Sequence, residues 1–273
     1  MNLLDVFYKA KEEKWAIGQF NFSTDEQLKA IVKAAEELDS PVILGTSEGE
    51  SSFFGLKEAI AERDVLRKKT NLPIFLNLDH GRDLDYIKKA VEEGYDCVHF
   101  DGSNLSLEEN IQKTKEIVNF AKQYGALVEG EINPIGNNLV GGKLTDPQEA
   151  LNFIKQTGVN SLAVAIGNVH GVFDKMPTLD LKRLQEIDKT TDTFLVLHGG
   201  SGIPEEEIKK TIKFGIVKIN INTELRVEWK ESLVRSLEES DSIKPYEILP
   251  AVINKISKVV SEKIKLFGSF KKL

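Results

Sequence analysis

The amino-acid sequence predicts an α/β protein, a (β/α)8 barrel with additional helices at its C-terminal end. From residue 15 onward, short apolar segments rich in β-branched residues alternate with longer amphipathic segments, a pattern typical of βα units around a parallel sheet. Eight segments read as strands, the number that this closed barrel requires. The 273 residues suit one barrel, since such domains typically take about 250 residues. We therefore expect a single domain over residues 1–273.

The predicted elements follow one another along the chain. Strands are predicted at 15–21, 41–46, 73–79, 97–102, 126–132, 161–167, 194–199 and 216–221. Helices are predicted at 25–38, 84–93, 107–124, 147–157, 181–189 and 204–214, several after a Thr, Ser or Asp cap. The first 15 residues predict a short amphipathic helix with Leu3, Leu4, Phe7 and Tyr8 on its buried side. Residues 223–273 exceed one helix, so we expect one or two additional helices there for packing or subunit contact.

Two other architectures share this alternation of elements. A solenoid is disfavoured because the units share no residue motif beyond strand and helix. A doubly wound open sheet usually carries G-x-G-x-x-G after its first strand, where this sequence reads GQFNFSTDEQ. The closed barrel is therefore favoured.

Composition limits the class of protein and its partners. No apolar run reaches the roughly 20 residues needed to span a membrane, and the first residues show no signal-peptide pattern. The single cysteine, Cys97, excludes an intramolecular disulfide and is typical of the reducing cytoplasm. The net charge of -7, without a dense Lys/Arg stripe, argues against nucleic acid as a partner. Small anionic substrates remain compatible with this charge, because local sites override it.

Three of the four histidines fall at predicted carboxyl ends of strands, where barrels build their active sites. These histidines are His80, His170 and His198, and the carboxylates at similar depth are Asp79, Asp101 and Glu131. Any one of the histidines could equally be a capped or surface side chain. Jointly, three imidazoles at one end of a barrel match the ligands of a catalytic divalent metal ion, zinc above all. His99 lies inside a predicted strand, and we interpret it as structural.

Glycine-rich turns indicate a second candidate site. HGGSG (198–202) leads into a predicted helix and GNVHG (167–171) ends a predicted strand, so backbone N–H groups of both can approach an anion closely. The last strand ends in NINT (220–223), which adds Asn220 and Thr223 as donors. Phosphate sites after strands 7 and 8 recur in barrels, so we predict a phosphate cradle. Tight βα turns also use glycine for other reasons.

Longer motifs resemble those of the class II fructose-bisphosphate and tagatose-bisphosphate aldolases over nearly the whole chain. In the order of that family, the sequence has GQFNFSTDEQLKAIVKAAEELDSPVIL, LDHG, DGSNLSLEEN, VEGEI, LAVAIGNVHG, LVLHGGSGIP and KININTELR. TDPQEA through SLAVAIG, and the GVFDKMP segment, are most similar to the tagatose-type branch.

The resemblance implies specific roles. His80, His170 and His198 would bind catalytic Zn²⁺, and Asp79 would move the proton on the aldehyde-derived oxygen. Glu131 and Asp101 would lie near a second divalent position, and a monovalent cation would sit by the substrate phosphate. The phosphate of dihydroxyacetone phosphate would be held by Gly171, Gly199, Ser201, Asn220 and Thr223, with Asn21 and Ser47 lining the same pocket. The resemblance also implies a homodimer or homotetramer.

Two stretches depart from the family pattern. The loop after the fifth strand usually carries a carboxylate that exchanges a substrate proton, but EINPIGNNLVGG (131–142) places Asn137 and Asn138 there. An amide cannot act as a general base, so Asp146 or a neighbouring subunit would have to supply this group, or the reaction is slower or different. Near the C-terminus, SIKPYEILPA (242–251) offers Lys244 where the family tends to bind the distal phosphate with Arg. An acceptor aldehyde without phosphate is therefore one hypothesis.

The sequence thus predicts a zinc-dependent lyase of carbohydrate metabolism that cleaves a ketose phosphate, with fructose 1,6-bisphosphate of glycolysis as the leading substrate. The enzymatic alternatives are a tagatose-bisphosphate or other phosphosugar aldolase, or an isomerase that uses the same sites. The non-enzymatic alternative is a catalytically impaired homologue that binds metal or sugar phosphate. A Schiff base on Lys218 is disfavoured, because the residues around it match the metal-dependent family.

Overall fold

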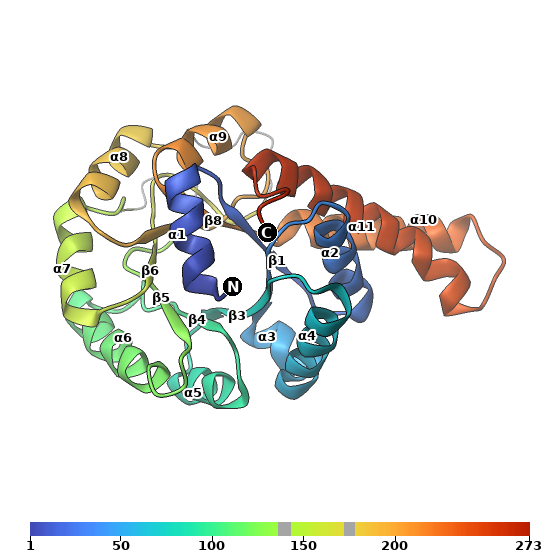
Figure 1. Cartoon of the computed structure of the whole chain (residues 1–273), viewed down its shortest axis with the longest axis horizontal. Coiled ribbons are helices and arrows are strands. Elements are labelled where there is room, and N and C mark those ends of the chain that lie inside the picture. Colours follow the sequence, from blue (N-terminus) through green and yellow to red (C-terminus); the bar gives the residue numbers. More distant parts are fainter. Residues whose placement is uncertain (136–142, 172–177) are drawn as a thin grey trace.

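The computed structural model describes residues 1–135, 143–171 and 178–273 and contains a closed barrel of eight parallel strands. The strands lie in sequence order around the barrel, and helices form a ring outside them (Figure 1). This confirms the predicted fold class. The strands are β1 (Ile17–Asn21), β2 (Val42–Ser47), β3 (Ile74–Gly81), β4 (Cys97–Phe100), β5 (Leu127–Glu131), β6 (Ser161–Ala163), β7 (Phe194–Leu197) and β8 (Ile216–Ile221).

The structure contains eleven helices in its described residues, including two between the second and third strands and two after the last strand. They are α1 (Leu3–Glu13), α2 (Asp25–Glu37), α3 (Glu48–Phe54), α4 (Leu56–Thr70), α5 (Leu84–Glu93), α6 (Leu107–Ala121), α7 (Pro147–Thr157), α8 (Leu181–Thr190), α9 (Glu205–Lys213), α10 (Thr223–Glu238) and α11 (Pro245–Phe267). Helices α3 and α4 lie between the second and third strands, where no helix range was predicted, because α3 is short and α4 is rich in charged residues with few apolar positions. Helices α10 and α11 form an arm that projects from the barrel (Figure 1).

Two local predictions were wrong. Tyr8 is 62% exposed, because the buried face of α1 follows the helical period through Leu3, Val6, Phe7 and Ala10. Strand β6 ends at Ala163 instead of residue 167. Beyond it, the backbone of Ala165 exchanges two hydrogen bonds with Thr145, which takes the chain out of the ladder.

An apolar layer closes the amino-terminal end of the barrel. Helix α1 packs its buried face on side chains from the starts of the strands, among them Ile17, Ile43, Phe75 and Phe194. Figure 1 shows α1 across this end of the barrel. Since this end is closed, polar chemistry is left to the opposite, carboxyl end of the strands.

Strand β3 contains a β-bulge beside the predicted site. Leu78 pairs with Val98 and Gly81 pairs with Phe100, so two residues of β3, Asp79 and His80, lie opposite the single residue His99. Successive residues of a regular strand point to opposite faces, but a bulge re-aims a side chain. The bulge therefore accounts for two adjacent residues, Asp79 and His80, both reaching the pocket.

None of the helices in the described ranges is long and apolar enough to cross a membrane.

Candidate active site

A polar pocket of about 760 Å³ opens at the carboxyl end of the strands. All but one of the predicted site residues line it: Ser47, Asp79, His80, Asp101, Glu131, His170, Gly171, His198, Gly199, Ser201, Asn220 and Thr223. Asn21 lies behind the wall instead, where its amide donates to Asp79 Oδ2 and to Glu50 Oε2, both at 2.9 Å. The sequence-predicted residues thus come together from all parts of the barrel.

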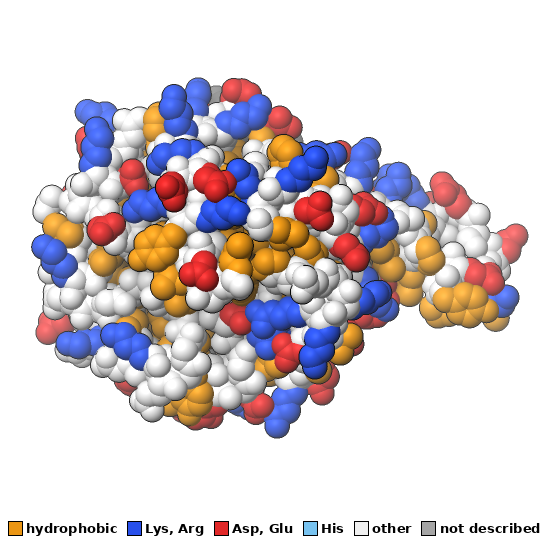
Figure 2. Space-filling model, viewed as in Figure 1, with side chains coloured by type: hydrophobic (Ala, Val, Ile, Leu, Met, Phe, Trp, Pro, Cys, Tyr) orange, Lys and Arg blue, Asp and Glu red, His pale blue; other side chains and the backbone are white. Residues whose placement is uncertain are grey.

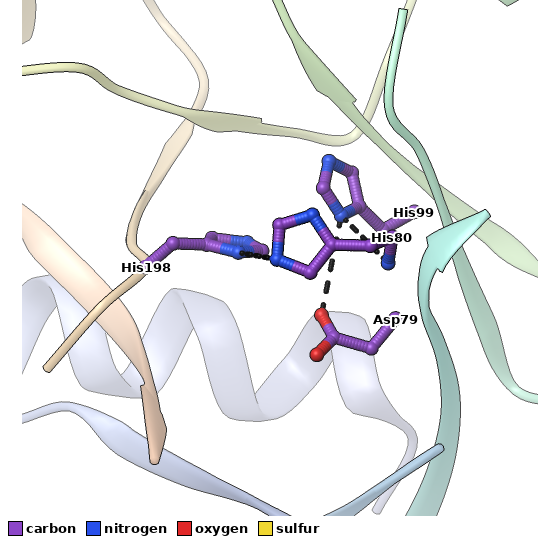
Figure 3. Close-up of side chains that lie close together, drawn as sticks. All are labelled: Asp79, His80, His99 and His198. Atoms are coloured by element: carbon purple, nitrogen blue, oxygen red, sulfur yellow. Dashed lines mark hydrogen bonds and ion pairs between the residues drawn. The ribbon is translucent and has the colours of Figure 1, made fainter. Parts of the chain in front are cut away.

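Two of the three predicted metal ligands face each other directly. His198 Nδ1 lies 3.1 Å from His80 Nε2, and the side chains of Asp79 and His99 complete a group whose nitrogen and oxygen atoms all lie within 4.8 Å of one another (Figure 3). His170 stands outside this group, but its ring centre is 4.9 Å from that of His80 and 6.2 Å from that of His198. The three imidazoles therefore share one end of the pocket, with His170 nearer to His80.

A carboxylate that sequence reasoning missed orients His198. Glu129 Oε1 lies 2.7 Å from His198 Nε2, and Glu129 Oε2 accepts from Lys218 Nζ at 2.6 Å. Since a carboxylate only accepts, the ring proton of His198 belongs on Nε2 and the lone pair of Nδ1 is directed at His80. One signal could have revealed Glu129: in VEGEI it lies two residues before Glu131, so both share the inner face of β5.

Asp79 is held as a carboxylate beneath the histidines. Its oxygens accept from Asn21 Nδ2 at 2.9 Å and from Asn220 Nδ2 at 3.0 Å. Burial raises the pKa of Asp79, but the charges of the neighbouring His80 and Lys218 outweigh burial and lower it. Asp79 is therefore ionised at neutral pH and able to accept a proton.

The carboxylates at the rim differ in their partners. Asp101 Oδ2 accepts from Arg82 Nε at 3.0 Å and Nη2 at 2.7 Å, while Asp101 Oδ1 accepts from Ser103 Oγ at 2.5 Å. Glu131 is nearly fully buried, and its Oε2 atom has no hydrogen-bond partner among the described residues. Burial, followed by the negative charge of Asp101, raises the pKa of Glu131 to about 8. Glu131 therefore has an oxygen free for a ligand, whereas Asp101 does not.

The predicted phosphate cradle is built by close contact between two turns. Gly199 adopts a positive φ of 64°, and a Cβ there would lie 2.2 Å from the carbonyl oxygen of Val169, so glycine is required. Asn168 Nδ2 donates to the His198 carbonyl at 2.9 Å and ties the same two turns together. The side-chain oxygens of Asn220 and Asn222 have no partner among the described residues. The two turns thus form a fixed backbone beside amide oxygens that are free to accept a hydrogen bond or to bind a cation.

The residues proposed to replace the family's missing groups lie elsewhere. Asp146 caps helix α7 by accepting from the N–H groups of Gln148 and Glu149, and it does not line the pocket. Lys244 lies on the arm, paired with Glu247 at 2.8 Å, and is absent from the pocket of its own chain. Asn137 and Asn138 lie outside the described residues, as does most of GVFDKMP.

Comparison with known proteins identifies the family of this chain. Residues 1–272 match the model of the family described as fructose-bisphosphate aldolase class-II. The chain belongs to this family. It is 37% identical to the 6-phospho-5-dehydro-2-deoxy-D-gluconate aldolase of Bacillus licheniformis, over 98% of this chain and 95% of that one. It is also 36% identical to a probable fructose-bisphosphate aldolase of Bacillus subtilis, over 98% of each chain.

The fold comparison agrees with this family. The crystal structure of the YdjI aldolase from Escherichia coli K12 superposes with a TM-score of 0.89 and 32% identity, covering 99% of this chain and 98% of that one. This class II aldolase is therefore a lyase, and its family acts on small phosphorylated sugars.

The contribution of the buried ion pair between Glu129 and Lys218 to the stability of the protein can be tested by mutation. Lys218→Met would leave the Glu129 carboxylate buried without its cation, so we expect a loss of about 3–5 kcal/mol in unfolding free energy. Urea unfolding measures this loss. Adding Glu129→Gln to Lys218→Met should recover part of it, because the unpaired charge is gone.

The matched control is Lys209→Met, which breaks the exposed pair with Glu206 and should leave the unfolding midpoint almost unchanged. Equal effects of Lys209→Met and Lys218→Met would contradict a structural role for the buried pair.

Proposed function

We propose that this class II aldolase uses Zn²⁺ to cleave a ketose phosphate reversibly into dihydroxyacetone phosphate and an aldehyde. Fructose 1,6-bisphosphate, which would yield glyceraldehyde 3-phosphate, is the leading substrate. The observation that carries the proposal is the approach of His80 Nε2 to His198 Nδ1, at 3.1 Å, above the ionised Asp79. Two imidazole nitrogens aimed at each other beside a third histidine suit a common cation.

The donor set fits zinc. His80, His170 and His198 would supply three neutral imidazole nitrogens, and the open pocket would leave a further position for substrate. The carboxylate of Glu129 behind His198 is the kind of partner that fixes zinc-binding histidines. A second divalent ion near Glu131 would have to displace Arg82 before it could use Asp101. A monovalent cation by the phosphate could use the free oxygens of Asn220 and Asn222.

The residues of the chain would divide the chemistry between them. The metal would act as a Lewis acid that stabilises the negative charge left when the carbon–carbon bond breaks. Asp79 would take the proton from the hydroxyl that becomes the aldehyde and return it in the reverse direction. Gly171, Gly199, Ser201, Asn220 and Thr223 would hold the phosphate, and Ser47 would line the same pocket. Asn21 would act through Asp79, which it contacts.

An imine mechanism has no support in the site. Lys218 is fully buried, donates to Glu129 at 2.6 Å and does not line the pocket. Its nitrogen therefore has no access to a substrate carbonyl.

The identity of the sugar depends on the far end of the pocket. The substrates named for the two Bacillus relatives are a deoxygluconate phosphate and fructose bisphosphate, which end in a carboxylate and a phosphate at the end distal to the shared phosphate. Arg82 lines the pocket and is 65% exposed at its side chain, and its guanidinium donates to the described residues through Nε and Nη2 alone, both to Asp101. We propose that its remaining N–H groups bind this distal anion. Tagatose bisphosphate remains an alternative substrate, because it carries the same distal phosphate and differs from fructose bisphosphate only in the stereochemistry of the sugar.

The arm supports association of identical chains. Leu237, Ile243 and Tyr246 at its free end are exposed, and Figure 2 shows apolar side chains gathered there. A homodimer or homotetramer would cover them, and would place Lys244 of the arm near another subunit. We also propose the cytoplasm as its location, on the strength of the single, buried and unpaired Cys97.

Metal removal tests the central proposal. Chelation of the purified protein should abolish cleavage of fructose 1,6-bisphosphate, and added Zn²⁺ should restore it. Asp79→Ala should keep its zinc yet lose roughly 10²–10⁴-fold in kcat, because the proton acceptor is gone. Asp146→Asn is the matched control, and it should keep full activity. A folded, zinc-loaded protein that cleaves neither fructose nor tagatose 1,6-bisphosphate would overturn the proposal.

Arg82→Ala tests the distal anion site. Loss of a charge-assisted contact of about 1.5–3 kcal/mol should lower kcat/KM for fructose 1,6-bisphosphate roughly 10- to 150-fold. Cleavage of fructose 1-phosphate, which lacks the distal anion, should change much less. Arg235→Ala, on the arm, is the control and should change neither. If the unaltered protein showed no preference for the bisphosphate, the results would instead favour an acceptor aldehyde that carries no phosphate.

Light scattering tests the proposed assembly. We expect a dimer or tetramer, and Tyr246→Asp should shift it towards monomer, because a charge would then replace an apolar contact. The exposed Tyr124, on the barrel, offers the control Tyr124→Asp, which should leave the assembly intact. A monomeric native protein would refute the assignment of this arm.

A further inference from the structure

We propose that His99 is a positioning residue, whose ring holds His80 in the backbone conformation from which His80 reaches the metal site. Its Nδ1 atom accepts a hydrogen bond from the His80 backbone N–H at 3.2 Å (Figure 3). His99 has no exposed surface and does not line the pocket, so it acts through His80 and not on substrate. The inference rests on the proposed metal site, but part of its test is independent of metal.

The bulge explains why His80 needs this support. His80 has a positive φ of 52°, in the left-handed region that residues other than glycine rarely adopt. Within the bulge, its N–H makes no ladder bond to β4, and a buried N–H without a partner is costly. The residue opposite the bulge is His99, and its side chain supplies the acceptor that the ladder does not.

The second ring nitrogen reaches towards Glu131. His99 Nε2 lies 3.5 Å from Glu131 Oε2, and neither atom has a hydrogen-bond partner among the described residues. Because Nδ1 accepts from a backbone N–H, the proton of a neutral ring must sit on Nε2. Nε2–H therefore faces an acceptor oxygen.

This tautomer decides against a different role for the same residue. His99 belongs by distance to the group of four side chains that could hold a metal ion. However, the lone pair of Nδ1 is directed at the His80 N–H, and Nε2 carries the proton. Neither nitrogen is free to bind a cation, so His99 stands behind the ligands and is not one of them.

A matched pair of variants tests the positioning role. In His99→Asn, the side-chain oxygen can occupy the place of Nδ1 and still accept from His80, whereas His99→Leu has similar size and no acceptor. The dissociation constant of Zn²⁺, measured by chelator competition, should rise roughly 10- to 100-fold in His99→Leu. In His99→Asn it should stay within about threefold of the unaltered protein. The Co²⁺-substituted proteins should show the same grouping in their visible absorption.

Hydrogen exchange of the His80 amide, in metal-free protein, provides the second readout. Protection should persist in the unaltered protein and in His99→Asn, and be lost in His99→Leu. Equal protection in all three proteins would overturn the inference, as would equal losses of Zn²⁺ affinity in both variants, which would instead mark His99 as a ligand. If the unaltered protein bound no Zn²⁺ at all, the proposed function would fail, yet the exchange result would still decide the role of His99.

Discussion

The buried carboxylate of Glu129 is the constraint around which the rest of the site is arranged. It is fully buried inside the barrel, where an unpaired charge would be strongly destabilising. Its two oxygens are therefore divided, one towards Lys218 and the other towards His198. This division selects the tautomer of His198 and aims its other nitrogen at His80. A requirement of folding, the pairing of a buried charge, thus also sets the direction of a candidate metal ligand.

The barrel separates stability and chemistry along its axis. At the amino-terminal end, helix α1 and the starts of the strands form an apolar layer around side chains such as Phe7 and Phe75. Above it the interior becomes polar, and Gln19 and Asn77 are hydrogen-bonded to each other at 2.8 Å. This buried polar layer is compatible with a stable fold because most of its groups are hydrogen-bonded to one another. Among the described residues, polar atoms of Glu131, Asn220 and Asn222 have no partner and lie on pocket-lining side chains, where a ligand would reach them, whereas Trp15 and Asn77 also carry such atoms but do not line the pocket.

The sequence was sufficient where the spacing of apolar residues and the position of a residue along its strand decide the structure. Strand ends locate polar residues at the barrel mouth, and the structure has both His80 and His198 lining the pocket there. The sequence was not sufficient where contacts with residues on other strands determine the role of a residue. Glu129 looked like an ordinary strand residue, because its importance depends on Lys218, 89 positions away. The bulge in β3 was equally hidden, since it is defined by register against β4 and not by the residues of β3 alone.

The bulge also joins the proposed metal site to the rim of the pocket. Asp101 Oδ2 lies 3.6 Å from His80 Nδ1 and 2.7 Å from Arg82 Nη2, so one carboxylate touches a candidate ligand and a candidate anion-binding group. Both partners come from the same few residues of β3 and its following turn. Asp101 therefore links the proposed distal-anion group, Arg82, to the proposed metal ligand His80. Relatives named for different sugars belong to the same family, so we propose that the rim determines substrate specificity in this chain, while the contact between Glu129 and His198 fixes the proposed metal-binding end.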